Sequence, residues 1–173
     1  AASDAAQARS SMALLDLGTG GGEWLSRLPN RPAKTRATEG WPPNVPIARE
    51  RLAPLGIEVF GVEPAPVNDE QTAATAIGML PFAGGAFDLV TSRNESYLPR
   101  EVKRILTDDG RFITQQVAGE ATDFYRLLGW PEPKIDVAWN LAFATAQLEA
   151  AGFVIEETAE GHEEKQFADI GAL

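Results

Sequence analysis

Acidic residues and glycines near the start of the chain are spaced in a way that could form a ligand-binding site. Asp16, Gly18, Gly20 and Gly22 occupy every second position, and Glu39 lies twenty-three positions after Asp16. Glycines permit a tight turn and let a ligand approach bare backbone. A carboxylate offers paired acceptors to two neighbouring hydroxyl groups. The pattern therefore predicts a binding site for a ligand that carries hydroxyls and tolerates negative charge nearby.

Ligands that carry phosphate fit this pattern poorly. A dinucleotide site follows G-x-G-x-x-G, and counting from Gly18 places Glu23 at the last position, where its carboxylate would repel a pyrophosphate. A P-loop needs a Gly-Lys pair, and the chain contains none. S-adenosylmethionine has no phosphate and carries a sulfonium and an ammonium group, so nearby carboxylates favour it. The interval to Glu39 also suits an acid that binds ribose hydroxyls in a Rossmann-like site.

Short apolar runs alternate with helical patterns, as in a parallel sheet with crossover helices. This order predicts a Rossmann-like, doubly wound α/β fold, with a mostly parallel seven-stranded sheet and helices on both faces. We expect a single domain over residues 1–173, and no part of this prediction depends on residues 1–10. Strands are predicted at 12–17, 34–38, 57–62, 87–91, 111–117, 153–157 and 167–173. Helices are predicted at 23–28, 44–52, 99–106 and 137–148, with Asn44 as a cap, Gly56 and Gly152 just past helix ends, and a loop at 63–78.

Composition limits the classes of partner. The chain has 173 residues, a formal net charge of −10 and no cysteine. A protein that grips a polyanion needs a basic patch, so the acidity argues against nucleic acid and favours a small-molecule acceptor. The absence of cysteine excludes disulfides and thiolate metal sites, and the lone His162 lies in a charge run, so no metal site is expected. No apolar run is long enough to span a membrane, and we expect a cytoplasmic protein.

Four stretches together resemble the class I S-adenosylmethionine-dependent methyltransferases, specifically the methyltransferase type 11 group. They are LLDLGTGGGEWL (14–25), ATEGWPPNVPIARERL (37–52), LPFAGGAFDLVTSRNESY (80–97) and REVKRILTDDGRFI (100–113). The resemblance implies that Gly18 and Gly20 line the methionine part of S-adenosylmethionine, that Asp16 supports the loop, and that Glu39 binds the ribose under Trp41. The full set of implied cofactor-binding residues is Asp16, Gly18, Thr19, Gly20, Glu39, Gly40, Trp41, Met79, Leu80 and Arg93.

The chain departs from the family pattern at three places. Ala76 stands where many relatives carry an Asp for the adenine amino group, so we expect backbone near Ile77, Met79 or Leu80 to recognise adenine. Asn94 stands where close relatives often carry a histidine. The usual Pro-Gly-Gly turn before the fifth strand reads Asp108-Asp109-Gly110.

The segment after the fourth strand is the candidate acceptor side, because ligands bind at the carboxyl edge of such sheets. Glu95 and Tyr97 are the candidate catalytic residues, with Glu95 as a base if the acceptor must lose a proton, and with Arg93 and Asn94 beside them. The competing interpretation makes Glu95 and Arg93 a surface ion pair and packs Tyr97 under the next helix.

Three functions are compatible with these observations to different degrees. The leading hypothesis is methyl transfer from S-adenosylmethionine to a small molecule by in-line displacement, with RNA or protein acceptors less favoured. The second is a non-catalytic domain that binds S-adenosylmethionine as a sensor or interaction module, which the missing adenine Asp and the missing histidine favour. The third, a nicotinamide-dependent oxidoreductase, conflicts with Glu23. The sequence predicts neither the acceptor nor the oligomeric state.

Overall fold

The computed structural model describes residues 11–63, 65, 79–118, 125–126, 128–131 and 139–161. The chain divides into two compact units, Ala1–Val117 and Ala118–Leu173. The glycine pattern, Glu39 and the segment after the fourth predicted strand all fall in the first unit. The prediction of a single domain over 1–173 stays a prediction.

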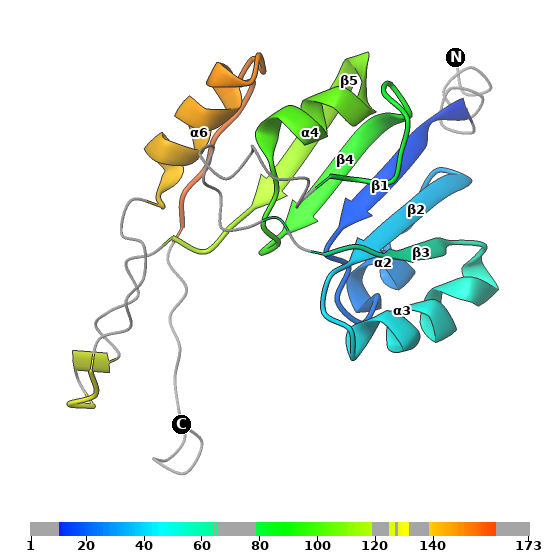
Figure 1. Ribbon diagram of the computed structural model, residues 1–173, viewed down its shortest axis with the longest axis horizontal. Helices are drawn as coiled ribbons and strands as arrows, with labels where there is room; N and C mark the ends of the chain where they lie inside the picture. Colours follow the sequence, from blue (N-terminus) through cyan, green and yellow to red (C-terminus); the bar gives the residue numbers. More distant parts are fainter. Residues whose placement is uncertain are drawn as a thin grey trace. The chain divides into compact units, whose positions relative to one another are not determined.

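The first unit contains a five-stranded parallel sheet in the order β3-β2-β1-β4-β5 (Figure 1). The strands are β1 (Ala13–Leu17), β2 (Lys34–Glu39), β3 (Glu58–Gly61), β4 (Phe87–Arg93) and β5 (Leu106–Gln115). From β1 the chain builds outward to β3 on one side, and it then returns to build β4 and β5 on the other side. This reversal of direction between β1 and β4 is the point where open α/β sheets bind their ligands.

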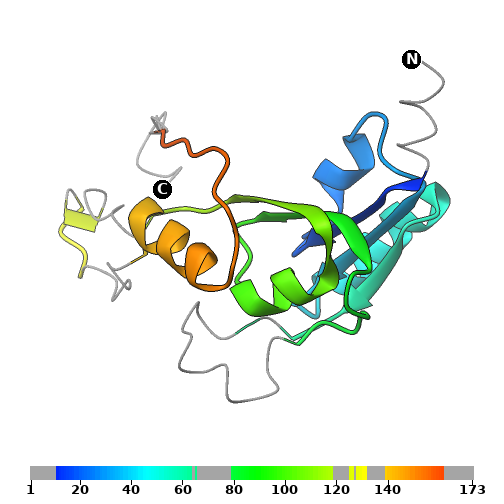
Figure 2. The ribbon, with the colours of Figure 1, turned by 90° about the horizontal axis from the view of Figure 1, so that it is seen from above.

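Helices cover both faces of this sheet, as the sequence predicts. They are α2 (Glu23–Arg27), α3 (Asn44–Leu52), which the 3-10 turn η1 (Ala53–Leu55) extends, and α4 (Pro99–Ile105). Figure 2 shows α2 and α4 on opposite sides of the strands. One core cluster joins α2 and α3 to one face of the sheet, through Leu14, Leu25, Ala37, Ala48, Leu52, Ile57 and Val59.

Local chemistry explains where these elements end. The left-handed Gly56, with φ of 71°, ends η1, as its predicted place after the helix requires. Pro99 occupies the first turn of α4, where its missing N–H costs no hydrogen bond. Asn44 does not cap α3, contrary to the prediction, because the helix begins at Asn44 itself and Pro43 precedes it without a side-chain bond.

The fifth strand begins earlier than predicted, at Leu106 rather than Arg111, and ends at Gln115. Its pairing with β4 jumps from Phe87–Leu106 to Leu89–Arg111, so the Asp108-Asp109-Gly110 segment bulges out of the ladder. The Asp108-Asp109-Gly110 turn, which departs from the family pattern, therefore forms a bulge within β5. Beyond it, regular pairing runs to Arg93 and Gln115, which brings the ends of β4 and β5 together.

The second unit contains α6 (Leu141–Ala150), which the Asn140 side chain caps by accepting a hydrogen bond from Phe143 N–H at 2.9 Å. Gly152, with φ of 87°, follows its end as predicted. The predicted sixth strand at 153–157 is wrong. This segment pairs with no strand of the described residues, and Val154 is 87% exposed, so a short apolar run alone did not produce a ladder. The predicted seventh strand, the loop at 63–78 in large part, and residues 1–10 lie outside the described residues.

The fold class is confirmed, with five strands in the described part of the chain where seven were predicted. None of the helices in those ranges combines the length and the apolar character needed to cross a bilayer. The cytoplasmic location stays a prediction.

Candidate functional site

A glycine turn connects β1 to α2 at the carboxyl edge of the sheet. Gly18, Gly20 and Gly22 have φ of 64°, 62° and 80°, a backbone region that side chains other than glycine rarely adopt. The Thr19 N–H donates to Thr38 O at 2.9 Å, which ties the turn to the end of β2. A Cβ added to Gly20 would meet no atom within 4 Å. The turn is therefore held in place at Thr19 and left open at Gly20.

Glu39, the last residue of β2, is 4% exposed, and both of its carboxylate oxygens are engaged by backbone. Gly20 N–H donates to Oε2 at 2.6 Å and Trp41 N–H donates to Oε1 at 2.8 Å. Each oxygen keeps a further acceptor position, because a carboxylate offers about four. The structure thus joins Glu39 to the glycine turn, as the spacing predicts, and orients it for two more donors.

Asp16 lies beneath the turn on β1 and is 4% exposed. Its Oδ1 accepts a hydrogen bond from the Thr91 hydroxyl of β4 at 2.7 Å. Burial raises the pKa of Asp16, and the bond from Thr91 partly offsets this. Asp16 therefore links β1 to β4 under the site, which agrees with a supporting role rather than an exposed one.

Glu95 packs directly onto the glycine turn. A Cβ added to Gly18 would lie 2.4 Å from both Cβ and Oε2 of Glu95. Burial and the neighbouring negative charge of Glu39 raise the pKa of the Glu95 carboxyl. The predicted alternative, a surface pair of Glu95 with Arg93, is absent among the described side chains. The guanidinium of Arg93 instead lies 4.7 Å from the ring centre of Trp24, on α2.

Tyr97 is 3% exposed, and its ring meets Phe112 of β5 edge to face at a centroid distance of 4.8 Å. Burial raises the pKa of Tyr97 to about 12, so its hydroxyl stays protonated at neutral pH. Tyr97 therefore packs against β5 in this structure. Tyr97 also lines the cavity of the candidate site, and its role as a catalytic residue stays a prediction.

The turn that carries Glu95 is held by Asn94 and by two residues outside the predicted site, Ser92 and Gln116. Asn94 has φ of 57°, and its N–H donates to Gln115 O at 2.9 Å. The Glu95 carbonyl accepts from the Ser92 hydroxyl at 3.3 Å and from Gln116 Nε2 at 3.1 Å.

Leu80 belongs to a second anchored segment. Its N–H donates to Glu101 Oε1 at 2.7 Å, and Arg104 of α4 donates to the carbonyls of Leu80 and Phe82 at 3.2 and 2.9 Å. Glu101, 4% exposed, also forms an ion pair with Arg104. The Leu80 N–H is thus already used, which argues against this group as the adenine donor. Buried Glu101 was missed because a charged residue in a helix is usually solvated.

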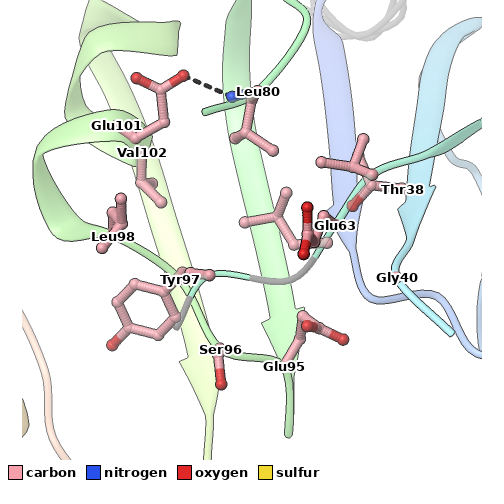
Figure 3. A pocket seen from close by; sticks show the side chains of 13 residues that line it. Thr38, Gly40, Glu63, Leu80, Glu95, Ser96, Tyr97, Leu98, Glu101 and Val102 are labelled. Carbon is pink, nitrogen blue, oxygen red and sulfur yellow. Dashed lines mark hydrogen bonds between the residues drawn. The ribbon is translucent and has the colours of Figure 1, made fainter. Parts of the chain in front are cut away.

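A cavity opens between these groups at the carboxyl edge (Figure 3). Thr38 and Gly40 border it on one side and Leu80 and Glu101 on another, and Glu95 lines it near the end of β4. Its enclosed volume is about 30 Å³, which is room for a water molecule. Trp41 and Met79 are 64% and 52% exposed and leave their surfaces free. No group of three or more His, Asp or Glu side chains in the described ranges is placed to bind a metal.

Comparison with known protein families identifies the family to which this chain belongs. The methyltransferase domain family matches residues 15–114, which span β1 to the end of β5 and include the turn, Glu39 and Glu95. The chain belongs to the methyltransferase domain family. No curated protein matches the chain. The predicted resemblance to class I methyltransferases is confirmed.

Solved structures show the same fold. A SAM-dependent methyltransferase from Aquifex aeolicus is 19% identical with a TM-score of 0.56, over 87% of this chain and 78% of that one. An S-adenosylmethionine-dependent methyltransferase from Mesorhizobium loti is 16% identical with a TM-score of 0.60, over 89% and 81%. The [4+2]-cyclase SpnF is 20% identical with a TM-score of 0.60, over 90% and 57%. The chain spans about two thirds of the length of several others.

Proposed function

We propose that this methyltransferase-family chain binds S-adenosylmethionine over the glycine turn and transfers the methyl group to a small-molecule acceptor. One observation carries the cofactor part of the proposal. Glu39 is buried, its two oxygens are oriented by the N–H groups of Gly20 and Trp41, and it stands beside the open Gly20 at the switch point of the sheet. Two adjacent ribose hydroxyls are the donors that such a fixed pair of oxygens suits.

Electrostatics supports a cation rather than a phosphate. Asp16, Glu39 and Glu95 surround the turn, and α2 begins with Glu23, which pairs with Arg51. A pyrophosphate over this helix would face that carboxylate, and α2 has only five residues to offer a dipole. These features disfavour a nicotinamide dinucleotide.

The remaining predicted residues take the following roles in this proposal. Gly18, Thr19 and Gly20 supply the cradle, Gly40 borders the cavity, and exposed Trp41 and Met79 are free to cover the nucleoside. Leu80 contributes its side chain. Since the enclosed cavity is small, binding has to widen it, and we expect Glu95, which lines it and packs over Gly18, to move.

Bound S-adenosylmethionine would supply an electrophilic methyl group on a sulfonium with a neutral leaving group. The chain then has to align the acceptor with that methyl group and exclude water, and alignment alone can contribute about 7–11 kcal/mol in well-oriented systems. Glu95 as a base for the acceptor stays a prediction. The net charge of −10 supports a small-molecule acceptor over nucleic acid.

A second candidate function is a domain that binds the cofactor without transferring its methyl group. Arg93 stacks on Trp24, so one predicted acceptor-side group is engaged elsewhere, and the hydroxyl of Tyr97, which lines the cavity, stays protonated at neutral pH. A fold does not determine which reaction a protein catalyses, and one structural neighbour with this fold is named as a cyclase.

Calorimetric titration with S-adenosylmethionine, S-adenosylhomocysteine and NAD tests the cofactor proposal. We expect both adenosyl compounds to bind and NAD not to bind, and the reverse result would contradict the proposal.

Gly20→Val should abolish binding because the branched side chain fills the open cradle. Gly56→Val is the matched control, since Gly56 has φ of 71° and open space around its Cβ position but lies outside the site. Transfer of radiolabelled methyl to cell-extract fractions then separates an enzyme from a non-catalytic domain.

A further inference from the structure

Three carboxylates approach the glycine turn from three strands. Asp16 lies at the end of β1, Glu39 ends β2, and Glu95 follows β4. Within the described residues, neither Glu39 nor Glu95 has a Lys or Arg at ion-pair distance. The negative charge beside the turn is therefore not neutralised by this part of the chain.

Of these three, Glu95 has the most freedom to respond to a ligand. Asp16 is held by Thr91, and Glu39 is held by two backbone N–H groups. The backbone of Glu95 is fixed at its carbonyl by Ser92 and Gln116, while its carboxylate reaches over Gly18. In Figure 3 this carboxylate points from the end of β4 toward the side of the cavity where Gly40 lies.

Glu23 offers an internal comparison on the same turn. It packs over Gly21 much as Glu95 packs over Gly18, with Oε1 at 2.5 Å from an added Cβ. Glu23, however, is exposed and forms an ion pair with Arg51. Glu95 is half-buried, lines the cavity and faces Glu39. Only Glu95 combines a carboxylate over the turn with a second, unneutralised carboxylate beside it.

We propose that Glu95 is a specificity-determining residue, which makes the site prefer a cationic methyl donor over its neutral product. This inference rests on the proposed binding of S-adenosylmethionine at the turn. The sulfonium brings one positive charge next to two carboxylates that otherwise repel each other, and attraction between opposite charges strengthens in a half-buried site. A neutral thioether brings no such charge.

The proposal connects to turnover through charge balance. When a nucleophile attacks the methyl carbon, the carbon–sulfur bond breaks and its electron pair stays on sulfur. The new bond joins the methyl carbon to the nucleophile, which loses a proton to solvent or to a base. The sulfonium thereby becomes a neutral thioether, the repulsion between Glu39 and Glu95 returns, and the product leaves more easily.

The test compares the affinities of three ligands for the full chain and its variants by calorimetry. The ligands are S-adenosylmethionine, S-adenosylhomocysteine, and the amine analogue that carries an ammonium in place of the sulfonium. The wild-type protein should bind both cationic compounds about tenfold or more tightly than S-adenosylhomocysteine. Glu95→Gln should reduce that ratio to about one and leave the affinity for S-adenosylhomocysteine unchanged or higher.

Two controls keep the result specific. Glu23→Gln removes a negative charge from the same turn but outside the cavity, and it should leave the ratio unchanged. Glu39→Gln should weaken all three ligands, because Glu39 binds ribose in the proposed site. An unchanged ratio in Glu95→Gln, with or without a fall in kcat, would overturn the inference while the cofactor proposal stands. Failure of all three ligands to bind the wild-type protein would overturn both.

Discussion

Two regions meet at the carboxyl edge of the sheet, and they are built differently. On the β1–β2 side, the glycine turn and Glu39 are joined by backbone N–H groups and a carbonyl, including the bonds from Gly20 and Trp41 to Glu39. On the β4–β5 side, the Glu95 carbonyl is held by the side chains of Ser92 on β4 and Gln116 just after β5, beside one backbone bond from Asn94 N–H to Gln115 O.

This difference separates what each region can do. Backbone contacts leave few ways to rearrange, so the β1–β2 side forms a rigid cradle that depends on glycines at positive φ and on one carboxylate. Side-chain contacts are replaceable one at a time, so the β4–β5 side can vary without loss of the fold. Substitutions on the first side should abolish binding, whereas those on the second side should tune it.

The largest effect is expected at Gly18, where the two regions touch. Gly18→Ala places a methyl group 2.4 Å from Glu95 atoms and also strains a φ of 64°. We expect the free energy of unfolding to fall by about 2–4 kcal/mol, from strain and overpacking together. Urea denaturation measures this. Gly56→Ala, with similar φ but open space, should cost only about 1 kcal/mol.

A double variant sharpens the same prediction. Combining Gly18→Ala with Glu95→Ala removes the overlap but not the backbone strain, so part of the lost stability should return. Additive losses from the two substitutions would show that the two residues do not meet.

The second effect concerns Glu39. Glu39→Gln replaces one oxygen by an amide nitrogen, which cannot accept from Gly20 or Trp41, so one part-buried N–H loses its partner at a cost of about 1 kcal/mol. We expect at least a tenfold loss of affinity for S-adenosylhomocysteine, measured by calorimetry. Glu58→Gln, on the exposed face of β3, should change neither quantity.

A smaller effect is expected on the β4–β5 side. Gln116→Ala removes hydrogen bonds from Nε2 to Glu95 O and to the Thr114 hydroxyl, so the free energy of unfolding should fall by about 1 kcal/mol. Affinity for S-adenosylhomocysteine should stay within a few-fold of the wild-type value. Gln115→Ala, at an exposed position of the same strand end, serves as the control. A complete loss of binding in Gln116→Ala would mean that the two regions are not separable.

The smallest effect is a dependence on pH. Burial and the charge of Glu39 raise the pKa of Glu95, so Glu95 takes up its proton at a higher pH than an ordinary glutamate. The groups that act on this region are Glu39 and Asp16, with Arg93 on the Asp16 side. As pH falls from 8 toward 5, the preference for S-adenosylmethionine over S-adenosylhomocysteine should decline by several-fold. Glu95→Gln should show no such decline, and an equal decline in both proteins would refute the assignment to Glu95.

The contrast between the regions also explains how much the sequence could predict. The β1–β2 side was predictable because glycines at alternate positions after a buried strand have few structural alternatives, and the spacing to Glu39 follows from one strand–helix–strand unit. The strands β1 to β4 were placed to within two residues for the same reason. Apolar residues mark β1, β3 and β4, and Gly40 directly follows β2.

The β4–β5 side was harder to predict, because its contacts join residues far apart in sequence. The sequence around Gln116 does not predict its hydrogen bond to the Glu95 carbonyl. Likewise, the sequence around Arg93 does not predict that it stacks on Trp24, and the sequence around Glu101 does not predict that it accepts a hydrogen bond from Leu80 N–H. The predicted strand at 153–157 failed for a related reason. A strand depends on a partner that supplies its hydrogen bonds, and a short apolar run does not reveal whether one is present.

A crystal structure of the chain with S-adenosylhomocysteine tests the central claim most directly. The account predicts both ribose hydroxyls on the Glu39 carboxylate, with the bonds from Gly20 and Trp41 intact and the homocysteine part over Gly18 and Gly20. A nucleoside bound away from Glu39, or a ligand whose pyrophosphate lies over the turn, would contradict it.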